Sequence, residues 1–147
     1  GWDIAKQDGT FTGDFQDQTK GTSTAKSMAD EGADIIFPVA GPVGLGASQF
    51  AMDSAGKVKI IGVDVDMSIS NPTQAEVYVA SVLKKIDAAV LQAVKDALAK
   101  TGGGTDYLGT LENGGVGVAI TSTITPELQA ELDAVTAGII DGSIVTK

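Results

Sequence analysis

Two short apolar runs, each bounded by turn-forming residues, constrain the fold of this chain most strongly. They occupy residues 34–40 (DIIFPVA) and 57–66 (KVKIIGVDVD). Such a run is typical of a strand buried on both faces of a parallel sheet. Both runs are far shorter than the roughly 20 apolar residues that a membrane-spanning helix needs. The sequence therefore predicts buried strands rather than membrane spans.

The rest of the chain alternates between these strands and amphipathic segments. Helical spacing of apolar residues predicts helices at residues 20–31, 47–55, 84–100 and 126–140. Further strands are expected at residues 76–82, 116–120 and 143–145, and a polar loop at residues 67–73. Regular alternation of strands and helices predicts an α/β domain with a mainly parallel sheet flanked by helices.

Charge and composition exclude several functions. The 147 residues include 10 Lys and Arg against 19 Asp and Glu, a formal net charge of −9, and no His or Cys. Nucleic-acid binding depends on a basic surface, so no nucleic-acid partner is expected. A Cys/His zinc site, a disulfide, a thiol nucleophile and a histidine general base are all excluded. No motif in the chain indicates a metal or another cofactor.

A glycine-rich segment, GPVGLG at residues 41–46, follows the first predicted strand. Ligands of parallel α/β sheets bind beyond the carboxyl ends of the strands, where this segment lies. Its glycines, Gly41, Gly44 and Gly46, have neither the dinucleotide spacing nor the phosphate-loop spacing. The segment is therefore either a tight strand-to-helix turn or a ligand-facing loop with free amide donors at the helix start.

Several charged or aromatic side chains are further candidates for ligand contact. Asp64 and Asp66 end the second strand and point to the same side if the strand continues. Paired carboxylates bind sugar hydroxyls or a hard cation, act as acid and base, or cap the next element. Lys84 lies one helical turn from Ser81, so the two face one cleft or Lys84 lies on a solvated helix face. Phe15, in a loop rich in Gly and Asp, is the least core-like aromatic residue.

Five blocks of sequence, in order, resemble one known family. They are GDFQDQTKG (13–21), EGADIIFPVAGPVGLG (31–46), IIGVDVD (60–66), SVLKKID (81–87) and LENGGVGVA (111–119). Together they resemble the basic membrane protein family of bacterial substrate-binding lipoproteins, which includes the purine nucleoside receptors of ABC transporters. The resemblance covers essentially the whole chain.

The resemblance implies one lobe of a type I periplasmic-binding-protein fold, in which two α/β lobes close over a ligand. Residues 1–147 then correspond to the C-terminal lobe, and residues 87–118 cross back toward an N-terminal lobe. That lobe and a lipoprotein signal would lie upstream of this chain. The apolar face of the helix at residues 84–100 would then be exposed, or covered by a second copy of the chain.

The resemblance also implies a function. The protein would be a non-catalytic component of an ABC importer, anchored outside the cytoplasm as a lipoprotein, that passes a nucleoside or similar hydroxylated ligand to a permease. Asp64 or Asp66, together with Lys84, would contact the ribose hydroxyls, and the glycine-rich segment would approach the base or sugar. Relatives commonly carry an aromatic residue that stacks on the purine two positions after the last glycine, where this chain has Ser48.

Two other functions are compatible with the residues alone. The chain could be an enzyme that processes a sugar or nucleotide, with Asp64 and Asp66 as acid and base. It could equally be a surface sensor or antigen module without saturable small-molecule binding. Turnover of the ligand separates the first alternative from a binding protein, and absence of ligand binding separates the second.

Overall fold

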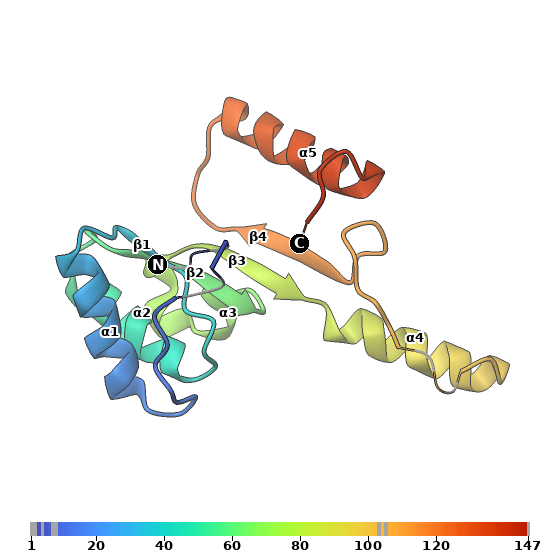
Figure 1. The fold of residues 1–147 in the computed structure, drawn as a ribbon, viewed down its shortest axis with the longest axis horizontal. Coiled ribbons are helices and arrows are strands. Elements are labelled where there is room, and N and C mark those ends of the chain that lie inside the picture. Colours follow the sequence, from blue (N-terminus) through green and yellow to red (C-terminus); the bar gives the residue numbers. More distant parts are fainter. Residues whose placement is uncertain (1–2, 4, 7–8, 103, 105, 147) are drawn as a thin grey trace.

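The computed structural model describes residues 3, 5–6, 9–102, 104 and 106–146, so both ends of the predicted lobe, residues 1 and 147, lie outside the described part (Figure 1). Its elements, in chain order, are α1 (Gln18–Asp30), β1 (Ile35–Ile36), α2 (Val43–Asp53), β2 (Lys59–Asp64), α3 (Met67–Ser70), the 3-10 helix η1 (Pro72–Val77), β3 (Tyr78–Lys84), α4 (Ile86–Ala99), β4 (Val116–Ile120) and α5 (Pro126–Asp141).

The strands form one sheet in the order β1-β2-β3-β4. The first three strands are parallel, and β4 runs antiparallel to β3. This arrangement confirms the predicted α/β class with a mainly parallel sheet. The expected strand at residues 143–145 does not form. Instead, the amide of Ile144 donates to the carbonyl of Gly138 at 2.8 Å, which folds the segment back onto the end of α5.

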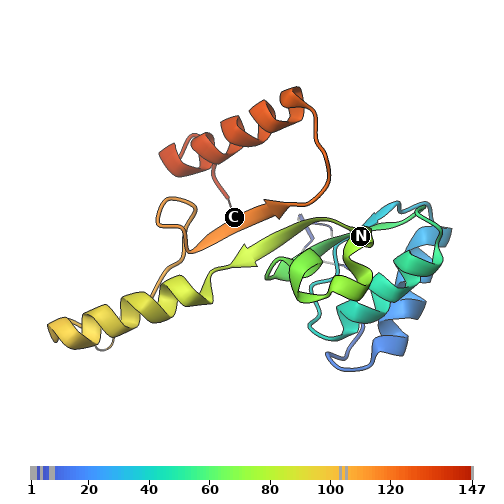
Figure 2. The ribbon, with the colours of Figure 1, turned by 180° about the vertical axis from the view of Figure 1, so that it is seen from behind.

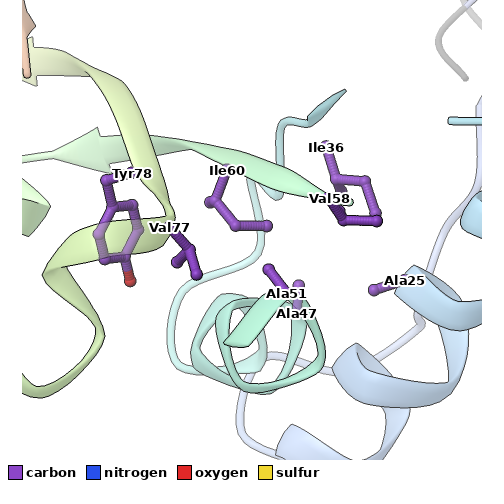
Figure 3. Close-up of a cluster of buried hydrophobic side chains, with 8 residues drawn as sticks. All are labelled: Ala25, Ile36, Ala47, Ala51, Val58, Ile60, Val77 and Tyr78. Atoms are coloured by element: carbon purple, nitrogen blue, oxygen red, sulfur yellow. The ribbon is translucent and has the colours of Figure 1, made fainter. Parts of the chain in front are cut away.

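The core lies between the sheet and the helices α1 and α2 (Figure 3). Ala47 and Ala51 are four residues apart on α2 and face Ile60 in the centre of β2, and all three are buried. The complete cluster contains Ala25, Ile36, Ala47, Ala51, Val58, Ile60, Val77 and Tyr78. Small residues on both helices let α1 and α2 pack closely together.

The other face of the sheet is open, contrary to the prediction that the strands are buried on both faces. Ile35 in β1, Val82 in β3 and Val118 in β4 are 52%, 40% and 57% exposed. Helix α4 projects away from the core and α5 lies beyond β4, as both views show (Figures 1 and 2). The chain therefore has one compact part and two helices that pack little against it.

The first predicted strand and the helix predicted after it have different boundaries in the structure. Only Ile35–Ile36 of the first apolar run forms a strand, since Pro38, two residues on, has no amide hydrogen for the ladder. Helix α2 begins at Val43, so Gly44 and Gly46 are helical and only Gly41 lies in the turn. The expected helix at residues 47–55 thus starts four residues earlier.

The segment between β2 and α4 also differs from the prediction. The polar loop expected at residues 67–73 contains α3 and the start of η1. Strand β3 begins at Tyr78 and continues through Lys84, and α4 begins only at Ile86. Lys84 is therefore the last residue of a strand and not the first residue of a helix.

Candidate functional site

A groove of about 280 Å³ opens where β2 ends and the connection from β1 enters α2. Residues from three separate stretches of the chain line it, among them Gly41, Gly44, Ser48, Asp64, Met67 and Tyr78. This is the edge of a parallel α/β sheet at which ligands bind. The volume is close to the lower end of the range for small-molecule sites, about 300–1,000 Å³.

Asp64 presents an unengaged carboxylate to this groove. Its φ of 69° lies in the left-handed region, which Asp tolerates better than most residues, and the Val65 amide donates across it to the Val63 carbonyl at 2.8 Å. That γ-turn ends β2 and holds a strained backbone conformation. The side chain is exposed and makes no hydrogen bond or ion pair within the described residues. A negative charge is therefore available to a ligand here.

Asp66 has a different role. Its Oδ1 accepts hydrogen bonds from the Ser68 amide at 3.0 Å and from the Ser68 hydroxyl at 2.6 Å, which makes it the N-cap of α3. Because β2 ends at Asp64, the strand does not continue to Asp66, and the condition under which both carboxylates would point to one side is not met. Asp66 does not line the groove, and its position matches the capping alternative.

Lys84 lies at the same sheet edge as Asp64. Leu83 pairs with Asp64 in the parallel ladder, and Lys84 follows it at the end of β3. Its side chain is exposed and makes no ion pair or hydrogen bond in the described part of the chain. The predicted pairing with Ser81 on a helix is wrong, since residues three apart in a strand point to opposite faces. Ser81 is buried, and its Oγ accepts from the Met67 amide at 3.1 Å.

The start of α2 offers no free amide donors in its first turn, which favours the tight-turn alternative for the glycine-rich segment over the loop with free amide donors. Pro42 has no amide hydrogen. The amides of Val43, Gly44 and Leu45 donate to the carbonyls of Phe15, Gly41 and Pro42 at 3.3, 2.9 and 3.1 Å. Gly41 and Gly44 line the groove, but this helix start is not arranged to bind an anion.

Two predicted site residues lie outside the groove. Gly46 faces α1, where Thr22 Oγ1 donates to its carbonyl at 2.9 Å. Phe15 lines a second pocket of about 310 Å³ between residues 10–15, α1 and the end of β1, and is 69% exposed. The carbonyl of Phe15 accepts a hydrogen bond from the Val43 amide at 3.3 Å, which connects this loop to the start of α2.

The groove also contains residues that the sequence analysis did not select as ligand contacts. Ser48 and Tyr78 are almost fully buried, and their hydroxyl oxygens lie 2.8 Å apart. Met67 lies beside them at the start of α3. The sequence analysis did not single out Tyr78. The signal that could have identified Tyr78 was the start of β3. The Tyr78 side chain reaches the groove because Tyr78 is the first residue of that strand.

Neither a metal site nor a membrane span is found in the described residues. No group of three or more Asp or Glu side chains among them could hold a metal ion. No helix in the described part of the chain is both long and apolar enough to cross a membrane.

The fold and the groove define one lobe of an α/β ligand-binding protein, and comparison with known proteins identifies its family. The family model for the ABC transporter substrate-binding protein PnrA-like group, Bmp, matches residues 7–147. The chain belongs to this family. The prediction from the five sequence blocks is thereby confirmed.

Individual relatives agree with this assignment. Basic membrane protein D of Borreliella burgdorferi is 36% identical over 107 residues, covering 71% of this chain and 30% of the relative. The ABC transporter nucleoside-binding protein BmpA of Lactococcus lactis is 30% identical over 152 aligned positions, covering 95% and 43%. The second name is that of a binding protein, and the matching family model describes substrate-binding proteins and not enzymes, as the sequence analysis predicted.

A solved structure gives the same result for the fold. The ABC transporter system solute-binding protein of Aeropyrum pernix superposes with a TM-score of 0.73 at 26% identity. The match covers 94% of this chain and 46% of that protein. This chain therefore spans less than half of the length of these relatives, and it matches one of their lobes.

Proposed function

We propose that this chain is the C-terminal lobe of the substrate-binding component of an ABC importer, which captures a nucleoside or a similar small hydroxylated ligand. The observation that carries the proposal is the unengaged Asp64 carboxylate in a groove at the carboxyl end of parallel strands. A carboxylate accepts strong charge-assisted hydrogen bonds from neighbouring hydroxyl groups, such as those of ribose. The printed name of the Lactococcus lactis relative supports a nucleoside as the ligand.

The charge around the groove favours an uncharged ligand over a phosphorylated one. Asp64 repels an anion, and the first amides of α2 already donate to carbonyl groups of the chain. The net charge of −9 adds a long-range repulsion. A nucleoside fits this environment better than a nucleotide. Lys84 lies one residue beyond Leu83, the ladder partner of Asp64, and its exposed ammonium group at this sheet edge would supply a cation for a sugar oxygen and not a phosphate cradle.

A second lobe completes this proposal. The accessible surface of the chain is 9906 Å², whereas a compact protein of 14.8 kDa has about 7,000 Å². Much of the excess is apolar surface on the open sheet face and on α4 and α5. Residues 87–118, which include most of α4, would connect the two lobes. Affinity would then come from closure of both lobes over the ligand.

The remaining partners follow from the family. The complete protein would be held outside the cytoplasm by a lipid anchor and would deliver its ligand to an ABC permease. In a form without the second lobe, the exposed apolar faces would favour self-association of the chain.

The proposal is tested by calorimetric titration of the complete natural protein carrying this chain with adenosine, guanosine, cytidine and uridine. Replacing Asp64→Ala or Lys84→Ala should weaken binding at least tenfold. Asp30→Asn on α1 and Lys85→Ala, next to Lys84, are the matched controls and should leave affinity unchanged.

Two results would contradict the proposal in different ways. Unchanged affinity in Asp64→Ala would show that this carboxylate does not contact the ligand. Failure of every nucleoside to bind would exclude the ligand class, and would favour the sensor or antigen alternative.

A further inference from the structure

Ser48 and Tyr78 form a hydrogen-bonded hydroxyl pair among the residues that line the groove. The pair belongs to a longer chain of hydrogen bonds. Asn71 Nδ2 donates to the Tyr78 hydroxyl at 3.2 Å, and Ser48 Oγ donates to the Gly44 carbonyl at 3.1 Å. Four residues, from α2, from β3 and from the junction of α3 and η1, are thus linked through two hydroxyl groups.

The directions of these bonds fix where the hydroxyl protons lie. A hydroxyl group has one proton and two acceptor lone pairs. The single proton of Ser48 is donated to Gly44, so Tyr78 must be the donor in the 2.8 Å contact between the pair. Asn71 in turn donates to Tyr78. Both hydroxyl protons are therefore used within the protein, and each oxygen keeps one acceptor lone pair.

The other polar groups named around the groove are either acceptors or donors that already bond within the protein. Asp64 is an acceptor at neutral pH. The amides of Gly44, Leu45 and Val65 donate to carbonyls at 2.9, 3.1 and 2.8 Å, and the Met67 amide donates to Ser81 Oγ. Apart from Lys84 at the sheet edge, the groove therefore supplies mainly acceptors, and a ligand pairs with them through its own hydrogen-bond donors.

We infer that Ser48 and Tyr78 select ligands that carry an exocyclic amino group on the base. This inference rests on the proposed function, since it assumes that the sugar hydroxyls face Asp64. The amino group donates to the free lone pairs of the hydroxyl pair. An otherwise identical base without the amino group leaves these buried acceptors unpaired, which weakens binding.

Two matched pairs of nucleosides test this selectivity. Guanosine and inosine differ only in the 2-amino group, and adenosine and purine riboside differ only in the 6-amino group. We expect the amino-bearing member of at least one pair to bind the complete natural protein about five- to tenfold more tightly, corresponding to one hydrogen bond.

The variant Ser48→Ala tests the assignment to the hydroxyl pair. It removes one acceptor and frees the Tyr78 proton, which turns the remaining hydroxyl into a donor. The preference for the amino-bearing nucleoside should then disappear. Tyr78→Phe, which keeps the ring, should reduce the same preference, and it serves as the second variant if Ser48→Ala does not fold.

Each outcome has a separate meaning. Equal affinity within both nucleoside pairs would overturn this inference and leave the proposed function intact. A preference that survives in both variants would show that other residues recognise the amino group. If none of the four nucleosides binds, the proposed function fails, and this inference fails with it.

Discussion

The hydroxyl of Thr22 in α1 donates a hydrogen bond of 2.9 Å to the carbonyl oxygen of Gly46 in α2. The two helices approach so closely here that a Cβ atom added at Gly46 would overlap the backbone carbonyl of Gln18. A backbone group cannot move aside as a flexible side chain can. Gly46 therefore holds the helix pair together, and its neighbour Gly44 faces the groove instead.

The variant Gly46→Ala should lower the free energy of unfolding by about 2–3 kcal/mol, because the new methyl group forces α1 and α2 apart. Gly44→Ala is the matched control. Its Cβ would lie 3.5 Å from the Pro38 ring, an ordinary contact, and alanine is the better helix former by about 1 kcal/mol. Urea denaturation measures both. Equal destabilisation by the two variants would contradict the close helix approach at Gly46.

The strained turn at Asp64 predicts that stability and binding can be separated. The variant Asp64→Gly should raise the free energy of unfolding by up to about 1 kcal/mol, because glycine adopts a φ of 69° without steric strain. The same variant should weaken nucleoside binding at least tenfold, since the carboxylate is lost. Asp64→Asn keeps the tolerance for this φ and should lose binding without gaining stability. Lower stability in Asp64→Gly would show that the carboxylate has a structural role.

The loop before α1 should respond to acid through Asp14. The amides of Asp17 and Gln16 donate to its carboxylate, and together with Lys20 they hold the pKa of Asp14 below its ordinary value of 3.8. A lowered pKa means that the folded chain favours the ionised form. The resulting stabilisation is complete above the unfolded-state pKa and is lost as the pH falls through the lower, folded-state pKa.

Comparison of the parent chain with Asp14→Asn measures this effect. The difference in unfolding free energy should be constant near pH 6 and should shrink as the pH falls below about 4. A difference that does not change with pH would show that the ionised form of Asp14 is not the stabilising species.

The sequence predicted the fold class and the sheet edge at which the groove lies, because apolar runs and glycines indicate where parallel strands end. The family was predicted from the resemblance of five ordered sequence blocks. It did not predict which side chains point into the groove. That depends on the last residue of each strand: β2 stops at Asp64, so Asp66 caps α3, and β3 continues to Lys84. A shift of one or two residues in a strand boundary changes the face on which a side chain lies.

The exposed apolar face of α4 was predictable only through the resemblance, and the open face of the sheet was not predicted. Periodicity predicts the helix at residues 84–100, which forms as Ile86–Ala99, but the same apolar stripe is present whether or not a partner covers it. In the structure no residue of α4 is buried. Local pattern describes what an element is able to bury, and only the tertiary structure shows what it does bury.

Helix α4 gives a direct test of whether a second lobe covers it. Val90 and Val94 are 57% and 50% exposed, so replacing either by Thr should change the unfolding free energy of the 147-residue chain by less than about 0.5 kcal/mol. Val and Thr have nearly the same shape and helix propensity, so the change in unfolding free energy depends mainly on whether the side chain is buried. In the complete natural protein, a covered α4 face would make each substitution destabilising by about 1–2 kcal/mol, because a hydroxyl enters an apolar contact. Chemical denaturation of the 147-residue chain and of the complete natural protein decides the question. Equally small effects of the substitutions in both proteins would show that no second lobe packs against this helix.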